Sequence, residues 1–414
     1  MGYAGGVLMY LRRAIEETIE KVKKQFPILL LTGPRQIGKT TVLKEIMGEE
    51  YEFITMDDPI ERRVFSEDPG LFLKNYPGKL LLDEIQYVPE GFPYLKRIVD
   101  ESKENGRFLM TGSQTFSMMK SVSESLAGRV GILQLQGLSL REKNEVDFNE
   151  AFIPSNEYIK TREKNFVSYT DLWNVIHRGY MPRLVLNSDI DWEIYYSSYV
   201  QTYIERDVRQ LTQVADENVF LRFMVALAAR SGELLNYQSV AQDVGVSPET
   251  IKRWVSILES SRIIYLLQPY ANNHLKRAIK TPKIYFMDTG LVAYLTRWPT
   301  AATLENGAVA GNIFETFVIS EIIKTYLNVG KVNPPLYYYR DRDQKEIDLL
   351  IEDGDKLYPV EIKLSANPVK SMGRHFPVLK QISNKEVQPG VILCQYEKKL
   401  WLDDNLMVLP IEYV

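Results

Sequence analysis

A glycine-rich loop near the amino terminus sets the strongest limit on how this chain can fold. It reads Thr32-Gly33-Pro34-Arg35-Gln36-Ile37-Gly38-Lys39-Thr40 and matches the phosphate-loop pattern GxxxxGK[ST] at every fixed position. An apolar run at residues 28–31, typical of a buried parallel strand, precedes the loop, and residues 41–46 read as a helix. Because a phosphate-binding loop requires strand, loop and helix in this order, we expect an α/β nucleotide-binding domain.

Each fixed position of this loop has a chemical task. Gly33 and Gly38 let backbone N–H groups curl around a phosphate, and the helix N-terminus adds positive potential. We expect Lys39 to reach the β- and γ-phosphates and the Thr40 hydroxyl to take one coordination position on Mg2+. The residues expected to bind the cofactors ATP and Mg2+ are Gly33, Pro34, Arg35, Gln36, Ile37, Gly38, Lys39, Thr40 and Thr41. The plainer alternative is a Gly-Pro turn with a solvated lysine.

Two further expected strands end in polar side chains. One leads into Asp83 and Glu84, and the other leads into Ser113 and Gln114. In a parallel sheet ligands bind beyond the carboxyl ends of the strands, so these side chains would meet the phosphate loop at one edge. We expect Asp83 to hold Mg2+ and Glu84 to polarise the attacking water. Ser113 or Gln114 is a candidate sensor of the γ-phosphate, and a polar cap on the next helix explains the pair equally well.

The composition excludes several classes of protein. One cysteine in 414 residues excludes a disulfide framework and a cysteine-rich zinc site, and the three histidines lack metal-ligand spacing. No apolar run approaches the roughly 20 residues of a membrane span, and the first residues make a poor signal peptide. A net charge of −4 confines any contact with nucleic acid to a local basic patch. We therefore expect a cytoplasmic protein with no membrane partner.

Several stretches resemble the AAA+ superfamily of ATPases, and within it a group of archaeal and bacterial ATP-binding proteins with a C-terminal domain of uncharacterised function. The matching stretches are residues 33–40 and 82–86, Thr111-Gly112-Ser113-Gln114, Leu126-Ala127-Gly128-Arg129, Leu138-Ser139-Leu140-Arg141-Glu142, Gly179-Tyr180-Met181-Pro182 and Tyr203-Ile204-Glu205-Arg206-Asp207-Val208. The resemblance implies that Arg129 is a sensor, or an arginine finger that acts on a neighbouring subunit of a homo-oligomer. Arg206 and Arg209 could serve the same end or pair with Asp207 and nearby acids, and for all three a structural role is the commoner one for arginine.

The middle of the chain divides into two expected units. After an ATPase domain at residues 1–160, the apolar residues of 161–232 have helical spacing and resemble the helical lid that follows an AAA+ core. Lids of this kind convert nucleotide hydrolysis into domain motion.

Residues 233–270 predict a winged helix-turn-helix. One helix ends at Gly245, and Ser247-Pro248 starts a second helix as its N-cap and first-turn residue. An apolar strand candidate follows this second helix, as the first strand of a wing would. The unit could bind DNA through Lys252 and Arg253, or it could serve as a rigid spacer.

Residues 271–414 carry a second chemical signature. Asp348 lies in one expected strand, and Glu361 and Lys363 share one face of the next. Two carboxylates and a lysine on one face suit phosphodiester cleavage, because the carboxylates can bind Mg2+ or Mn2+, with Glu315 as a further ligand from a helix. The set resembles the PD-(D/E)xK nuclease superfamily, which implies a restriction-endonuclease-like α/β domain. A half-exposed hairpin is the plainer alternative, and such a fold does not establish cleavage.

These observations predict a Mg-dependent AAA+ ATPase with a helical lid, a winged helix and a nuclease-like C-terminal domain. ATP hydrolysis is expected to move the appended domains. Two alternatives stay open: an ATP-regulated, metal-dependent DNA nuclease, and a non-enzymatic, nucleotide-switched DNA-binding or adaptor protein.

Overall fold

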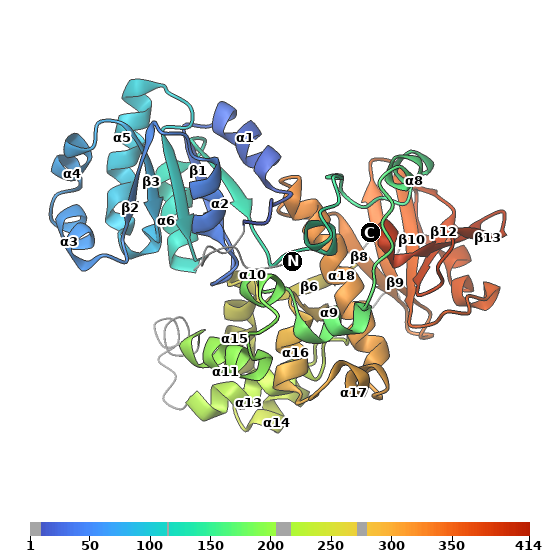
Figure 1. The fold of residues 1–414 in the computed structure, drawn as a ribbon. Coiled ribbons are helices and arrows are strands. Elements are labelled where there is room, and N and C mark those ends of the chain that lie inside the picture. The colour runs from blue at the N-terminus through green and yellow to red at the C-terminus, as the bar shows by residue number, and fades with distance from the viewer. Residues whose placement is uncertain (1–9, 114–115, 204–216, 271–279) are drawn as a thin grey trace.

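The protein is described here by a computed structural model that covers residues 10–113, 116–203, 217–270 and 280–414. An amino-terminal α/β domain and a carboxyl-terminal sheet lie on either side of one long helix, α18 (Ala310–Asn328), and further helices pack below them in the view of Figure 1.

The amino-terminal sheet is parallel throughout and has the strand order β2-β3-β4-β1-β5. Its strands are β1 (Ile28–Thr32), β2 (Tyr51–Thr55), β3 (Lys79–Asp83), β4 (Phe108–Gly112) and β5 (Val130–Gln134). Its helices are α1 (Glu16–Gln25), α2 (Lys39–Ile46), α3 (Pro59–Glu67), α4 (Pro69–Asn75), α5 (Phe92–Ser102) and α6 (Phe116–Leu126). Alternating strands and helices in this order confirm the expected doubly wound α/β domain.

Both faces of this sheet are covered, which explains why its strands read as continuous apolar runs. Ile28 and Leu30 of β1 pack into one hydrophobic cluster with side chains of α3 to α6. Leu29 and Leu31 face the opposite side and pack with Ile19 of α1, among others. The carboxyl edge of the strands, where the phosphate loop follows β1, therefore belongs to a sheet that is buried on both faces.

A proline divides one helical stretch of the amino-terminal domain into two helices. Residues 59–75 form α3 and α4 because Pro69 has no backbone N–H with which to continue α3. Asp68 caps the second piece, and its Oδ1 accepts from the Leu71 N–H at 2.9 Å.

The middle of the chain is helical, as the apolar spacing predicts. Its helices are α7 (Leu140–Lys143), α8 (Asn156–Glu163), α9 (Leu172–Arg178), α10 (Pro182–Leu186), α11 (Trp192–Tyr203), α13 (Glu217–Ala228), α14 (Tyr237–Val244), α15 (Pro248–Ser260), α16 (Thr289–Leu295) and α17 (Ala301–Glu305). Gly245 ends α14 with a φ of +80°. The Ser247 hydroxyl caps α15 by accepting from the Thr250 N–H at 3.2 Å, which confirms both expected helix ends.

A hairpin joins this middle part to the carboxyl-terminal sheet. Strands β6 (Ile264–Pro269) and β7 (Lys283–Phe286) pair in antiparallel fashion, and β6 also pairs in parallel with β8 (Leu336–Arg340). The expected boundary between residues 270 and 271 thus falls between two paired strands.

The carboxyl-terminal sheet has the strand order β13-β14-β12-β10-β9-β8-β6-β7, with β11 paired to β10. The remaining elements are β9 (Glu346–Asp353), β10 (Lys356–Lys363), α19 (Leu379–Ile382), β11 (Glu386–Val387), β12 (Gly390–Cys394), β13 (Leu400–Asp403) and β14 (Leu406–Pro410). The mixed pairing of β9, β10, β12 and β14 places this part in the α/β class.

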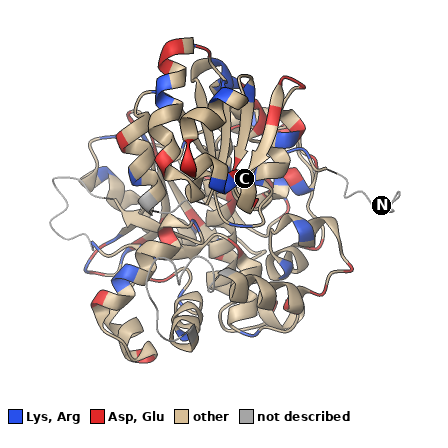
Figure 2. Ribbon diagram, turned by 90° about the vertical axis from the view of Figure 1, so that its left-hand side faces the viewer, with Lys and Arg blue, Asp and Glu red and all other residues tan. Residues whose placement is uncertain are grey.

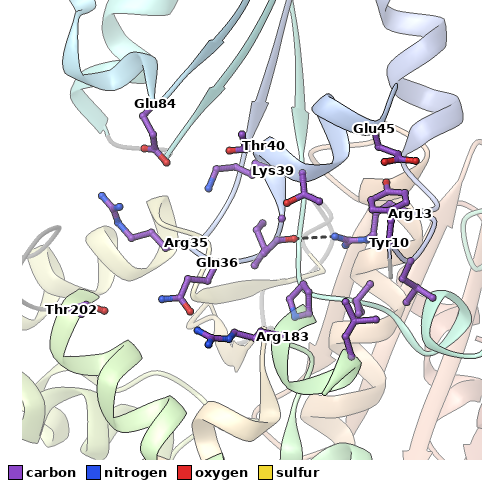
Figure 3. Close-up of a pocket in the computed structure, with 17 residues that line it drawn as sticks. Tyr10, Arg13, Arg35, Gln36, Lys39, Thr40, Glu45, Glu84, Arg183 and Thr202 are labelled. Carbon is purple, nitrogen blue, oxygen red and sulfur yellow. Dashed lines mark hydrogen bonds between the residues drawn. The ribbon is translucent and has the colours of Figure 1, made fainter. Parts of the chain in front are cut away.

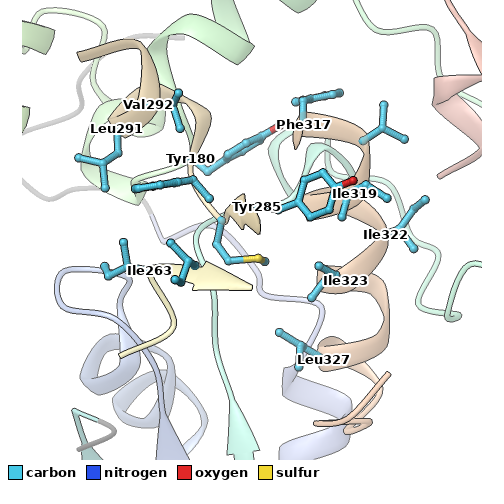
Figure 4. Close-up of a cluster of buried hydrophobic side chains, with 14 of the residues drawn as sticks. Tyr180, Ile263, Tyr285, Leu291, Val292, Phe317, Ile319, Ile322, Ile323 and Leu327 are labelled. Carbon is cyan, nitrogen blue, oxygen red and sulfur yellow. The ribbon is translucent and has the colours of Figure 1, made fainter. Parts of the chain in front are cut away.

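Helix α18 is buried along nearly its whole length and contacts several parts of the fold. Figure 4 shows Phe317, Ile322 and Leu327 of this helix in one cluster with Tyr180 and Tyr285 from the middle of the chain. Its carboxyl end also touches the amino-terminal domain, because the Asn328 carbonyl accepts from the Thr18 hydroxyl at 2.6 Å. Among the described helices, none combines the length and the apolar content needed to cross a membrane.

Candidate functional site

The phosphate-loop motif forms the turn between β1 and α2, at the carboxyl edge of the sheet. Gly33 has a φ of +149°, and a Cβ atom at this position would lie 2.2 Å from the Leu135 carbonyl oxygen. Gly38 is the N-cap of α2 and has a φ of +88°. Both positions therefore require glycine, the first because another part of the backbone passes too close and the second because of its backbone conformation.

Lys39 is turned back over this loop. Its side chain is buried, and Nζ donates to the carbonyl oxygens of Gly33 at 3.1 Å and Pro34 at 2.8 Å. An ammonium group that lies over backbone carbonyls at the start of a helix can exchange them for phosphate oxygens with little movement of the chain.

Asp83 lies at the end of β3, close to the hydroxyl that the motif supplies. Its Oδ1 accepts from the Thr40 hydroxyl at 2.5 Å and from the Thr111 hydroxyl at 2.6 Å, and its Oδ2 accepts from Thr55 at 3.1 Å. A carboxylate and a hydroxyl in contact form a hard oxygen donor set of the kind that Mg2+ prefers. The residues present therefore fit this metal.

Glu84 follows in a left-handed conformation with a φ of +57°. Its N–H donates to the Thr111 hydroxyl at 3.1 Å, and its side-chain carboxylate accepts from the Gln86 amide. Gln86 in turn accepts from the Ser113 N–H at 3.2 Å, so the ends of β3 and β4 are tied together. Within the described residues the buried Ser113 hydroxyl has no hydrogen-bond partner, while Gln114 lies outside them.

A cavity of about 860 Å3 opens beside the loop (Figure 3). Its lining comes from several separate parts of the chain: the segment before α1, the phosphate-loop region with α2, the ends of the segments after β3 and β5, and helices α10 and α11. The lining residues are Tyr10, Leu11, Arg13, Arg35, Gln36, Ile37, Gly38, Lys39, Thr40, Thr41, Glu45, Glu84, Leu138, Pro182, Arg183, Leu186 and Thr202. Seven of the nine expected loop positions and Glu84 therefore face one space.

The sequence prediction missed the apolar side of this cavity. Tyr10, Leu11, Leu138, Pro182 and Leu186 line it, and they come from three distant stretches. Two of those stretches resemble the AAA+ group, but nothing local in the sequence places them beside the phosphate loop. Such a wall suits the flat apolar faces of a nucleotide base.

The Arg13 side chain holds the phosphate loop in position. Its guanidinium donates to the Ile37 carbonyl at 3.0 Å, to the Gln136 carbonyl at 2.8 Å and to Glu142 Oε1 at 2.9 Å. Glu142 also closes a capping box with Ser139 at the start of α7. Burial opposes ionisation of Glu142, but the Arg13 charge and backbone hydrogen bonds hold its pKa below the usual range.

The structure does not bring Arg129 to this cavity. Arg129 directly precedes β5, level with the start of β1, and so lies at the opposite edge of the sheet. It forms a two-point ion pair with Asp100, with Nε–Oδ1 at 2.5 Å and Nη2–Oδ2 at 2.9 Å. Arg206 and Arg209 lie outside the described residues.

The carboxyl-terminal part brings three of its four predicted site residues together. Lys363 Nζ lies 2.8 Å from Asp348 Oδ2 and 2.5 Å from Glu361 Oε2. The fourth residue, Glu315, accepts instead from Lys283 at 3.1 Å and from the Tyr285 hydroxyl at 2.5 Å. Across the described residues, no group of three or more His, Cys, Asp or Glu side chains is arranged to hold a metal ion.

Glu361 holds a proton at neutral pH. Burial, followed by the nearby Asp348 charge, raises the pKa of Glu361 to about 9. For Asp348, burial acts in the same direction, but the charges of Lys363 and Lys283 overcome it and hold the pKa below the usual range. One proton is thus retained between the two carboxyl groups.

This raised pKa makes the stability of the protein depend on pH. The folded state keeps the Glu361 proton, whereas the unfolded state releases it above about pH 4. The stability that this proton gives to the folded state is therefore lost as the pH rises through the folded pKa of Glu361. Glutamine does not ionise, so Glu361→Gln does not lose this stability. Its melting temperature minus that of the wild type should therefore increase as the pH rises from about 5 to about 9. Thermal unfolding at several pH values checks this, and a difference that does not change with pH would contradict it.

Three family comparisons cover most of the chain. Residues 25–144 match the AAA domain family, residues 169–302 match the domain of unknown function DUF8612, and residues 310–414 match the domain of unknown function DUF4143. The first match spans the phosphate loop, Asp83 and Glu84. The part of the chain that is similar to AAA domains is therefore the part that holds the phosphate loop and both carboxylates.

Two relatives match nearly the whole chain. An uncharacterized protein of Mycobacterium tuberculosis is 29% identical over 408 residues, which is 97% of this chain and 84% of the relative. An uncharacterized protein of Methanocaldococcus jannaschii is 24% identical over 432 residues, with 97% and 86% covered. The solved structure of a Walker-type ATPase of Pyrococcus abyssi has a TM-score of 0.40 at 13% identity, and the match covers 70% of this chain and 96% of that chain.

Proposed function

We propose that this protein binds Mg-ATP and hydrolyses it, and that hydrolysis moves the appended middle and carboxyl-terminal parts. The observation that carries the proposal is the contact between the Thr40 hydroxyl and Asp83 at 2.5 Å, beside a cavity lined by Lys39 and Glu84. The proposal is supported by the closeness of this hydroxyl and carboxylate to a cavity that an ammonium group and a second carboxylate line, the set of groups that phosphoryl transfer uses.

Each residue then has a defined task. Lys39 leaves its carbonyl partners and binds the terminal phosphates, while the N–H groups of the loop hold the remaining phosphate oxygens. Glu84, held by Gln86, orients a water molecule and accepts its proton. Mg2+ beside Thr40 and Asp83 would neutralise charge that develops on the phosphates.

Hydrogen bonds connect the surroundings of the cavity to α11 and α18, so a change at the nucleotide site could be passed to these helices. The Tyr195 hydroxyl of α11 donates to the Gln36 side chain in the loop at 2.9 Å. On the other side, Glu321 of α18 accepts from the Leu140 N–H at 2.7 Å, and Lys324 donates to the Leu138 carbonyl at 2.9 Å. A shift of the loop or of residues 138–140 would therefore reach both α11 and α18.

Arg129 could act on ATP only at an interface between two subunits. Because it lies at the edge of the sheet opposite to the phosphate loop, it can contact a nucleotide only in a neighbouring copy of the chain. In such a homo-oligomer it would exchange Asp100 for the terminal phosphate.

Calorimetry with Mg-ATP tests the proposal. The wild type is expected to bind, and Lys39→Ala to bind about 10- to 150-fold more weakly, because a hydrogen bond to a charged group contributes about 1.5–3 kcal/mol. Lys44→Ala is the matched control, since Lys44 lies on the same helix but does not line the cavity. A folded wild-type protein without affinity for purine nucleotides in the presence of Mg2+ would remove the proposal.

A second candidate, nucleotide-switched DNA binding, rests on the exposed face of α15. Lys252 and Arg253 are exposed there, and Lys252 also lines a groove with Lys280. In Figure 2 basic and acidic residues are mixed over the ribbon, so any contact with phosphate depends on such a local patch.

Binding of labelled duplex DNA at several salt concentrations tests this second candidate. In Lys252→Ala/Arg253→Ala the affinity should fall, and the salt slope should decrease by about 2, one for each lost phosphate contact. Lys96→Ala/Arg97→Ala removes the same pair of charges from α5 and should leave binding unchanged. Equal slopes in all three proteins would rule out this role for α15.

A further inference from the structure

A buried ammonium group lies among the carboxylates of the carboxyl-terminal part. The side chain of Lys283 on β7 is only 4% exposed, and its Nζ lies 3.1 Å from Glu315 Oε1 and 2.5 Å from Glu346 Oε1. Burial opposes its charge, but Glu315, Asp348 and Glu346 together keep the pKa of Lys283 above the usual range. Three carboxylates from α18 and β9 therefore act on one ammonium group.

The charges of the whole cluster are balanced by the chain itself. Its carboxyl groups are Glu315, Glu346, Asp348 and Glu361, and its cations are Lys283, Arg340 and Lys363. Arg340 Nη1 lies 3.1 Å from Glu346 Oε2, so every cation of this cluster has a carboxylate partner. Three cations are thus paired with four carboxyl groups of the same cluster.

The donor set consequently does not fit a divalent metal ion. A cation such as Mg2+ or Mn2+ is held by ionised oxygens with free lone pairs. Here Glu315 Oε1 accepts from Lys283 and from Tyr285, and Asp348 Oδ2 accepts from Lys363 and from the Ile362 N–H. Lys363 Nζ also lies 2.5 Å from Glu361 Oε2, so each of these carboxyl groups already has an ammonium group beside it. A metal ion would have to displace an ammonium group that is already buried and paired.

We propose that Lys283 is the resident cation of this site: its ammonium group lies between Glu315 and Glu346, where a divalent metal held by these carboxylates would have to bind. In the native chain the cluster then joins β7 to α18 and β9 and does not assemble a metal-dependent nuclease centre. Removal of the Lys283 charge should turn the same carboxylates into a metal site.

Binding of Mn2+ to the full-length chain, followed by the loss of the free-ion paramagnetic resonance signal, tests this inference. Lys283→Met should bind about one Mn2+ per chain more than the wild type, because it leaves carboxylates without their cation. Lys283→Met/Glu315→Gln should lose that ion, and Lys283→Arg, which keeps the charge, should resemble the wild type. Lys280→Met is the control for removal of a nearby exposed lysine.

Thermal unfolding gives a readout that does not depend on nuclease activity. Lys283→Met should melt at a lower temperature than the wild type and should recover part of the loss when Mn2+ is added. If Lys283→Met does not fold, the wild type can be compared with Asp348→Asn/Glu361→Gln, and the two should bind the same amount of Mn2+. A Mn2+ ion that the wild type binds and this double variant loses would overturn the inference, as would plasmid nicking by the wild type that the double variant lacks.

Discussion

Glu84→Gln is expected to reduce ATP hydrolysis by about 10²- to 10⁴-fold, the range by which a positioned general base accelerates a reaction. Glutamine keeps the size of the side chain and its hydrogen bond with Gln86, but it cannot accept a proton from water. Lys39 and Asp83 are unchanged, so affinity for Mg-ATP should stay close to that of the wild type. Phosphate release under single-turnover conditions and calorimetry measure the two quantities separately.

Glu45→Gln is the matched control for this prediction. Glu45 lines the same cavity, but Figure 3 shows it beside Tyr10 and Arg13, away from Glu84. Its substitution removes one carboxylate from the same space and should leave the turnover rate within a few-fold of the wild type. Turnover by Glu84→Gln that equals turnover by Glu45→Gln would show that Glu84 is not the base.

Arg13→Ala is expected to lower the free energy of unfolding by about 3–5 kcal/mol, because it leaves Glu142 buried without its partner. The two side chains are 5% and 3% exposed and meet at 2.9 Å. The same change frees the Ile37 carbonyl, so we also expect weaker binding of Mg-ATP. Urea unfolding followed by circular dichroism, with and without nucleotide, measures both effects.

The neighbouring residue provides the control. Arg12 is 67% exposed and pairs with acidic side chains only at the surface, so Arg12→Ala should cost about 0–1 kcal/mol. Equal losses in the two variants would mean that the buried pair does not stabilise the loop.

This pair also predicts a dependence on pH. The folded pKa of Glu142 is held below its unfolded value, so its contribution is present above the unfolded pKa and is lost as the pH falls through the folded pKa. The difference in stability between the wild type and Arg13→Ala should therefore narrow below about pH 4.

The local sequence was enough to place the phosphate-binding edge. The glycine spacing, the apolar run before it and the helix after it lie within 20 residues, and parallel strands bring their carboxyl ends to one edge. Asp83 could be placed beside Thr40 for the same reason, although 43 residues separate them. The alternation of side chains across a short turn likewise placed Asp348 near Glu361 and Lys363.

The tertiary structure alone decided which residues complete these sites. Arg13 meets Glu142 across 129 residues of sequence, and Lys283 meets Glu315 across 32, and neither pair belongs to a repeating pattern. The resemblance of residues 126–129 to AAA+ proteins suggests an arginine finger at Arg129. The strand register, however, puts Arg129 at the edge of its sheet opposite to the phosphate loop. Periodicity and motif spacing report contacts between near neighbours and the direction of side chains on one element. Which distant elements pack together depends on the burial of the whole core, and here that packing selects Arg13 beneath the loop and Lys283 among the carboxylates.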